Sequence, residues 1–324
     1  MLQIVAQRPL RIETRRFAVP WQFLSGLCPA VSKSEIMSPM KFPNRYSINM
    51  IGFMQGRLSP IRNGRIQSFP WGHWENEFRQ AEDLGFTLME WTIDSERFSV
   101  NPLVTTDGQS DINQLSRTHG LLIPSVTCDY FMENPFWKND VVVIRKNLIS
   151  IMDGMRRVGA KILVIPLVDS SSLKDMGQRD KVTDFFISLE SELSDNGLQI
   201  AFESDFEPQA LLEYVSNFNS KYFGINYDIG NSASLGLNPT AEFEAYGSRI
   251  LNIHVKDREL GGSTVPLGEG VADFTTIFKL MKDFNYRGNL IMQTARSSEG
   301  KHAEVLTKYR NMILGWKENS SHAS

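Results

Sequence analysis

Short apolar runs alternate with amphipathic segments along most of the chain. Eight runs follow one another from residue 47 onward: INMIGFM from Ile48, FTLMEW from Phe86, LLIPSV from Leu121, ILVIP from Ile162, LQIAFE from Leu198, FGINYD from Phe223, ILNIHV from Ile250 and NLIMQT from Asn289. Runs this continuously apolar are typical of strands in a parallel sheet that is covered by helices. We therefore predict eight buried parallel strands.

The segments between the runs have the periodicity of helices. Examples are WENEFRQAEDLG, VVVIRKNLISIMDGMRRVG, KVTDFFISLESELSDNG and FTTIFKLMKDFNYRG. In the second of these, apolar residues recur at intervals of three and four, as a helix packed on a sheet requires: Ile144, Leu148, Ile151, Met155 and Val158. Four glycines lie just before strands, where the end of a helix commonly needs positive φ: Gly85, Gly159, Gly197 and Gly288.

Eight strand and helix units in about 270 residues predict an α/β fold of the closed (β/α)8 TIM barrel type rather than an open doubly wound sheet. No GxGxxG motif follows the first strand, so a dinucleotide site is not indicated. We divide the chain into a poorly ordered N-terminal extension at 1–46, a barrel catalytic domain at 47–317 and a C-terminal tail at 318–324.

The extension differs from the barrel in its charge. Residues 1–46 carry seven Lys or Arg and two Asp or Glu; removing these from the totals of 34 and 37 leaves 27 basic and 35 acidic residues, a net charge of −8. That charge does not favour nucleic acid as a partner. Two interpretations of the extension stay open. It is a targeting peptide, although without the apolar stretch of a secretory signal, or a disordered start that precedes later candidate starts at Met37, Met40 or Met50.

The composition narrows the class of protein further. A chain of 324 residues with 41% hydrophobic and 22% charged residues can bury a large core as a soluble globular protein. No apolar run approaches 18 residues, so we expect no membrane span. Cys28 and Cys128 stand alone in the sequence, which predicts neither a disulfide framework nor a zinc-cysteine site and fits a reducing, cytoplasmic setting.

The last four strands each end on a residue that can bind a divalent metal. These residues are Glu203, Asp228, His254 and Gln293. The C-terminal ends of the strands meet in a parallel barrel, so we expect the four side chains to converge. One such residue alone is more often a helix cap or a core residue. Four in succession are harder to explain, because two buried carboxylates repel each other unless a cation relieves the repulsion.

The ligand types indicate which metal this site would hold. Two carboxylates, an imidazole and an amide oxygen form a hard, oxygen-dominated set. We expect Mn²⁺ first, with Mg²⁺, Co²⁺ and Zn²⁺ as alternatives.

Other strand ends carry further candidates: Gln55, Arg57, Glu90, Asp129 and Asp169. Arg57 and Arg296 follow the first and eighth strands, which adjoin in a closed barrel, and guanidinium groups there could bind a substrate phosphate or carboxylate. Surface arginines at the rim are the equal alternative.

The chain also resembles a known family, the xylose isomerase-like TIM barrels, which include tagatose and psicose epimerases, hydroxypyruvate isomerase, inosose dehydratase and, more distantly, zinc-type apurinic endonuclease. The resemblance runs from about Ile48 to Trp316. Its motifs are GFMQGRLSP, EDLGFTLMEW, IAFES, INYDIGN, NIHVKD and VPLGEGVADFTTIFKLMKDFNYRGNLIMQ, and LGEG-x-x-DF followed by a helix and Y-x-G is the most specific of them.

The resemblance implies roles for the strand-end residues. In sugar epimerases of this family two glutamates, an aspartate and a histidine bind the metal, and both glutamates exchange protons with the substrate. This implies metal binding and a general base at Glu203, and metal binding at Asp228 and His254. The eighth-strand position departs from the family, because Gln293 has an amide that can bind a metal but cannot take up and return a proton. The DIGN motif also places Asn231 where relatives often have a substrate-binding His.

A one-base mechanism is consistent with these residues. Glu203 would take the proton next to a metal-polarised carbonyl, and Lys256 or Glu90 would return it. Each of the two also has a structural interpretation: Lys256 as a permanent partner of Asp257 or Glu90, and Glu90 as a residue that orients a neighbouring ligand. Either way, the expected activity is that of an isomerase or epimerase of a keto sugar, sugar phosphate or sugar acid.

Two aromatic stretches after the first and third strands, QSFPWGHW at 67–74 and DYFMENPFW at 129–137, could form a lid, a surface for self-association, or simply packing. The expected partner is a small carbohydrate, with no nucleic acid or membrane, and a homo-oligomer is allowed. Alternative functions are a polyol-ketone dehydratase, a non-catalytic ligand-binding barrel that Gln293 would favour, and a repair nuclease. The nuclease is disfavoured, because only one of five histidines lies on a predicted strand.

Overall fold

Eight parallel strands close into one barrel in the order β1-β10-β7-β6-β5-β4-β3-β2, so the predicted (β/α)8 fold is confirmed. The structure is a computed structural model, and it describes residues 50–297 and 300–322. The barrel strands are β1 Ile51–Met54, β2 Met89–Ile93, β3 Ser125–Cys128, β4 Ile162–Leu167, β5 Gln199–Ser204, β6 Phe223–Asp228, β7 Ile250–Val255 and β10 Leu290–Met292. A short antiparallel pair, β8 Asp257–Arg258 and β9 Thr264–Val265, follows β7.

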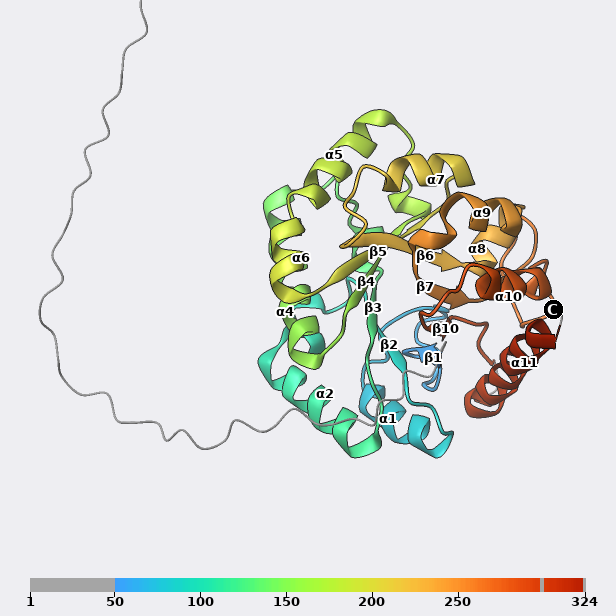
Figure 1. Cartoon of the computed structure of the whole chain (residues 1–324). Coiled ribbons are helices and arrows are strands. Elements are labelled where there is room, and N and C mark those ends of the chain that lie inside the picture. Colours follow the sequence, from blue (N-terminus) through green and yellow to red (C-terminus); the bar gives the residue numbers. More distant parts are fainter. Residues whose placement is uncertain (1–49, 298–299, 323–324) are drawn as a thin grey trace, which may run out of the picture. The chain divides into compact units, whose positions relative to one another are not determined.

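The helices surround the strands (Figure 1). They are α1 Trp74–Asp83, α2 Thr106–His119, α3 Tyr130–Glu133, α4 Val141–Val158, α5 Met176–Ile187, α6 Glu190–Asn196, α7 Pro208–Val215, α8 Ile229–Ser234, α9 Pro239–Tyr246, α10 Phe274–Asp283 and α11 His302–His322. The 3-10 turns are η1 Phe98–Val100, η2 Pro102–Val104, η3 Asp169–Ser171 and η4 Gly247–Arg249. None of the helices in the described ranges is long and apolar enough to cross a membrane.

Amphipathic packing explains the helical layer. In α4 the predicted apolar stripe is buried at Ile144, Leu148, Ile151 and Met155, while Val158 is partly buried. Burial of each such side chain contributes about 1.5–3 kcal/mol to folding. The segment 181–197, which the sequence marks as helical, contains parts of two helices, because Ser188 Oγ donates to the Phe185 carbonyl at 2.6 Å and the helical ladder stops there.

Three of the four predicted helix-ending glycines have positive φ: Gly85 at 71°, Gly159 at 85° and Gly197 at 61°. The prediction was wrong for Gly288, where Asn285 takes the left-handed conformation instead at φ 55°. Gly288 is needed for space, since a Cβ there would lie 2.7 Å from the Leu251 carbonyl oxygen.

The last helix extends past the end that the sequence division gives the barrel. Helix α11 continues to His322, past residue 317, because the intervening residues include no Gly or Pro that would stop it. The predictions made for 1–46 and for Cys28 lie outside the described residues. Cys128 is a buried free thiol.

Candidate active site

Three of the four predicted metal ligands converge inside the C-terminal mouth of the barrel. One ligand atom from each of Glu203 on β5, Asp228 on β6 and His254 on β7 lies within 4.8 Å of the other two, and all three residues are buried. The register explains the convergence, because Asp228 pairs directly with His254 across neighbouring strands.

Gln293 lies directly after β10 and joins this group through Lys256. The Lys256 ammonium donates to Gln293 Oε1 at 2.9 Å and lies 2.7 Å from Asp228 Oδ2. The predicted structural partners of Lys256 were wrong. Asp257 instead accepts backbone N–H groups of the loop between β9 and α10, at 2.8 Å from Gly268 and 3.0 Å from Gly270.

Amide groups hold the first carboxylate in place. Glu203 Oε2 accepts from the Asn226 amide at 2.8 Å, and Oε1 accepts from the Asn231 amide at 2.7 Å. Asn231 Oδ1 in turn accepts from Arg258 at 2.8 Å. The carboxylate of Glu203 is therefore fixed from both sides, and Asn231 contacts the same group that we expect to act as the base.

Asp228 has a different arrangement. Its Oδ1 caps α8 by accepting the Asn231 backbone N–H at 2.8 Å. Its Oδ2 lies 2.7 Å from the Lys256 ammonium and forms an ion pair with it. A metal ion bound here would compete with this ammonium for the same oxygen.

The two nitrogens of His254 face different groups. Nε2 lies 2.7 Å from Glu90 Oε1, while Nδ1 lies 3.2 Å from Glu203 Oε2 and 3.9 Å from Asp228 Oδ2. A metal-binding His commonly donates its other ring N–H to a carboxylate, which fixes its tautomer and orientation. Nδ1 is thus the nitrogen that could bind a metal, and Glu90 stands behind the imidazole.

Glu90 itself is enclosed by donors. Ser125, Thr127 and Asn252 all donate to its carboxylate, which has no solvent exposure. Glu90 lies on β2 and His254 on β7, and β1 and β10 separate these strands, so the contact crosses the barrel interior.

The charges of the site are strongly coupled. Burial opposes the ionisation of Glu203, but the hydrogen bond and charge of His254 and the charge of Lys256 outweigh it and lower the pKa of Glu203. Burial, helped by the charge of Glu203, raises the pKa of Asp228 despite Lys256. For His254 burial is outweighed by Glu90 and Glu203, and its pKa rises to about 10. A proton on His254 therefore occupies the position that a cation would compete for.

These features fit a divalent cation. Two carboxylates and one imidazole nitrogen point at a common volume, and the imidazole has the supporting carboxylate that metal-binding histidines use. The amide oxygen of Gln293 accepts from Lys256, and metal binding by Gln293 stays a prediction.

The two predicted substrate-binding arginines make contacts to backbone carbonyls. Arg57 is buried and donates to Thr294 at 2.9 Å and to Ile66 at 3.1 Å, and Arg296 donates to Ser59. Burial, together with the charge of Arg296, lowers the pKa of Arg57 to about 9. These bonds join the loop after β1 to the segment after β10, and binding of a substrate anion by either residue stays a prediction.

The buried polar layer beneath the ligands was not predicted from the sequence. Asn226 and Asn252 hydrogen-bond to each other at 2.9 Å, and both contact the carboxylates of the site. A signal was present, because Asn226 precedes Asp228 by two residues and Asn252 precedes His254 by two. Alternate residues of a strand face the same side, so each asparagine points where its ligand points.

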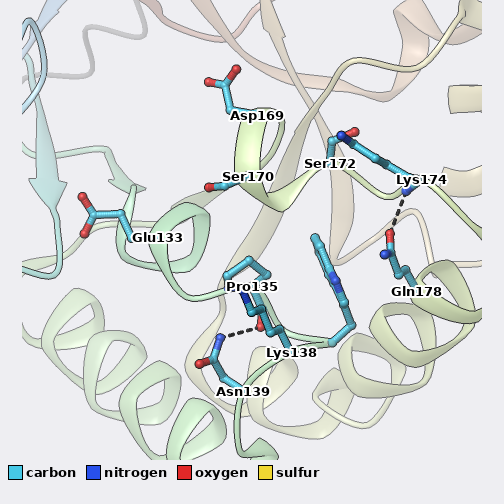
Figure 2. A pocket seen from close by; sticks show the side chains of 10 residues that line it. Glu133, Pro135, Lys138, Asn139, Asp169, Ser170, Ser172, Lys174 and Gln178 are labelled. Carbon is cyan, nitrogen blue, oxygen red and sulfur yellow. Dashed lines mark hydrogen bonds between the residues drawn. The ribbon is translucent and has the colours of Figure 1, made fainter.

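A cleft of about 410 Å³ opens among the loops after β3 and β4. Figure 2 shows Glu133, Lys138, Asp169, Lys174 and Gln178 around it. Trp137, from the second aromatic stretch, also lines the cleft. The other aromatic residues of that stretch pack in the core, where Phe131 and Phe136 stack with ring centroids 4.6 Å apart.

Comparison with known proteins defines the class. Residues 78–312 match the family described as the xylose isomerase-like TIM barrel. The chain belongs to this family, as its motifs predicted.

Proteins with sequences similar to this chain include sugar epimerases. The chain is similar to the L-ribulose-5-phosphate 3-epimerase UlaE of Shigella flexneri serotype 5b (strain 8401), with 26% identity over 257 residues that cover 72% of this chain and 86% of that protein. UlaE of Escherichia coli (strain SE11) is also 26% identical, over 256 residues covering the same shares.

Solved structures show the same fold at low identity. The IOLI protein with a binding zinc atom is 17% identical with a TM-score of 0.65, covering 84% of this chain and 99% of that chain. A xylose isomerase-like barrel from Mycobacterium smegmatis in complex with magnesium is 17% identical with a TM-score of 0.62, covering 85% and 98%. An L-ribulose 3-epimerase is 14% identical with a TM-score of 0.65, covering 85% and 96%.

Proposed function

We propose that this protein is a metal-dependent epimerase or isomerase of a keto sugar, sugar phosphate or sugar acid. The observation that carries the proposal is the buried convergence of Glu203, Asp228 and His254 at the C-terminal mouth of the barrel. Catalytic residues of TIM barrels come from this end of several strands. The names of the UlaE relatives support a sugar as the substrate.

Glu203, Asp228, His254 through Nδ1, and the amide oxygen of Gln293 would hold the cation, with Mn²⁺ as our first choice for this hard ligand set. When bound, a divalent cation supplies Lewis-acid polarisation of the substrate's carbonyl and adjacent hydroxyl oxygens, which acidifies the neighbouring C–H bond.

Glu203 is assigned as the base. Its lowered pKa keeps the carboxylate ionised near neutral pH, and the amides of Asn226 and Asn231 hold it in one orientation. Taking the proton from the carbon next to the carbonyl leaves an enediolate. Return of a proton to the neighbouring carbon gives isomerisation, and return to the opposite face of the same carbon gives epimerisation.

We assign supporting roles to two other residues. Lys256 is a charged donor for an enediolate oxygen, because its ammonium already lies beside Asp228 and Gln293. Glu90 orients the imidazole of His254 and does not touch the substrate, since His254 and three further donors surround its carboxylate.

Solvent deuterium exchange tests the proposal. The full chain, supplied with Mn²⁺, is incubated in D₂O with a panel of ketoses and ketose 5-phosphates that includes L-ribulose 5-phosphate. We expect deuterium next to the carbonyl of at least one sugar, together with an isomer or epimer, and loss of both on chelation. Tight metal binding without exchange on any sugar would contradict the proposal and favour a binding protein. Loss of water from the substrate would indicate the dehydratase, which shares the enolisation step.

Replacing Gln293 by Glu tests the effect of an amide at the eighth-strand position, where sugar epimerases of this family have a glutamate. We expect the metal to bind more tightly, because an anionic ligand replaces a neutral one. We expect the rate of product formation to change by less than about threefold, because another group already returns the proton. Metal titration and kcat measurement check both. A tenfold or larger gain in kcat would show instead that a missing proton donor limits the enzyme.

A further inference from the structure

Epimerisation, unlike isomerisation by a single base, needs a second group that donates a proton to carbon from the face opposite Glu203, and none of Gln293, Glu90 and Lys256 supplies it. Gln293 has an amide that does not titrate near neutral pH. Glu90 lies behind His254 with its oxygens occupied by donors. Lys256 is held between Asp228 and Gln293.

Another carboxyl group lies just past the C-terminal end of β3. Ser125 and Thr127 both donate to Glu90, so their side chains face the inside of the barrel. Asp129 follows this strand with helical φ and ψ of −63° and −17°, and the charges of Glu203 and His254 both act on its carboxyl group, which places it near the same interior. Asp129 is buried, with only 9% of its surface exposed, at the point where β3 gives way to α3.

The carboxyl group of Asp129 has no structural task within the described ranges. It occupies the N-cap position of α3 but makes no capping hydrogen bond. No other hydrogen bond or ion pair of its side chain is found among residues 50–297 and 300–322. Other buried carboxyls are committed: Asp94 accepts the N–H groups of Phe69 and Glu96, at 2.9 and 3.1 Å. A buried acid without such partners is unusual and favours a functional role.

We propose that Asp129 is the second proton-transfer group of this site, the acid that returns a proton to the substrate where Glu203 does not. The inference rests on the proposed function. The carboxylate of Glu203 takes the C–H proton and becomes a carboxylic acid, while the carboxylic acid of Asp129 gives a proton to the enediolate carbon and becomes a carboxylate. The substrate loses and gains one proton, no electrons are transferred to the protein, and exchange with water resets both groups.

The electrostatic surroundings suit this role. Burial, and then the charges of Glu203, Asp94 and Glu133, raise the pKa of Asp129 to about 7, against an opposing contribution from His254. The other charged or titratable groups that act on it are Arg57, through its opposite charge, and the adjacent thiol of Cys128. A group with this pKa has both forms available near neutral pH, which is what a general acid requires.

The test uses the metal-loaded full chain and compares two rates, deuterium entry into remaining substrate and product formation. In Asp129→Asn we expect product formation to fall by about 10²-fold or more, the usual contribution of a general acid. We expect deuterium entry through Glu203 to persist. Asp180→Asn is the matched control: it removes an exposed carboxyl on helix α5 and should leave both rates unchanged.

Product formation at the wild-type rate in Asp129→Asn would overturn the inference. An equal loss of both rates in this variant, together with lost metal affinity, would also overturn it, because it would indicate a structural role for Asp129. The wild-type protein gives a second readout that needs no variant. Product formed per deuterium incorporated should fall as the pH rises and the acid form of Asp129 is lost, and a flat ratio would overturn the inference. A wild-type protein with neither exchange nor product on any sugar would overturn the proposed function itself.

Discussion

Glutamine in place of Glu203 is expected to lower the rate of proton exchange from the substrate by about 10³-fold, within the range that a positioned general base contributes. The amide keeps the size of the side chain and an oxygen that can bind a cation, but it has no basic carboxylate. We expect metal affinity to fall far less than the exchange rate. Deuterium incorporation and metal titration on the same preparation check the two expectations.

The control for this substitution is Glu207→Gln. Glu207 is an exposed residue at the N-cap of α7, three residues beyond the end of β5, and its replacement should leave exchange unchanged. Survival of exchange within about tenfold in Glu203→Gln would remove Glu203 from the role of base. Loss of exchange and metal binding in proportion would mean that Glu203 acts only as a ligand.

Two of the strands could be predicted from the sequence with their full bounds. The runs at 223–228 and 250–255 coincide with β6 and β7. The run at 121–126 does not coincide with β3, which covers Ser125–Cys128. The apolar residues of that run lie mainly before β3, whose inward residues are Ser125 and Thr127, hydroxyl donors to Glu90.

The candidate site was predictable to the extent that it follows from topology. Parallel strands bring their C-terminal ends together, so the convergence of Glu203, Asp228 and His254 could be expected before any coordinates. Contacts that depend on the direction of the side chains could not be predicted from the sequence. The pairing of Lys256 with Asp228 and the contact of Glu90 with His254 join strands whose relative side-chain geometry no single sequence specifies.

Glu90 and His254 form an ion pair with no solvent exposure of either side chain. Removing one partner of such a pair leaves the other group buried and unpaired, and here three further donors would lose their acceptor as well. The same carboxylate fixes the ring orientation that presents Nδ1 to Glu203 and Asp228. Stability and metal affinity should therefore fall together when Glu90 is changed.

Leucine in place of Glu90 is expected to lower the free energy of unfolding of the metal-free protein by about 3–5 kcal/mol and the metal affinity by about 10- to 100-fold. Denaturant unfolding and metal titration measure the two quantities. The pKa of Glu90 is lowered from 4.5, because His254, Ser125 and Thr127 outweigh burial, so its stabilisation is present above pH 4.5 and lost in acid. The pKa of His254 is raised from 6.5 to about 10, so its stabilisation is complete below pH 6.5 and lost as the pH rises through about 10.

The effect of Glu90→Leu should therefore be largest between pH 4.5 and 6.5, where both contributions are present, and should shrink toward pH 10. Glu82→Leu is the matched control, because Glu82 also pairs with a histidine, His119, at 2.7 Å, but on the surface of the protein. Exposed pairs contribute about 0–1 kcal/mol, so this change should cost little at any pH. Equal costs for the two substitutions would mean that the buried contact neither stabilises the barrel nor orients His254, and the metal-orienting role of Glu90 would be lost with it.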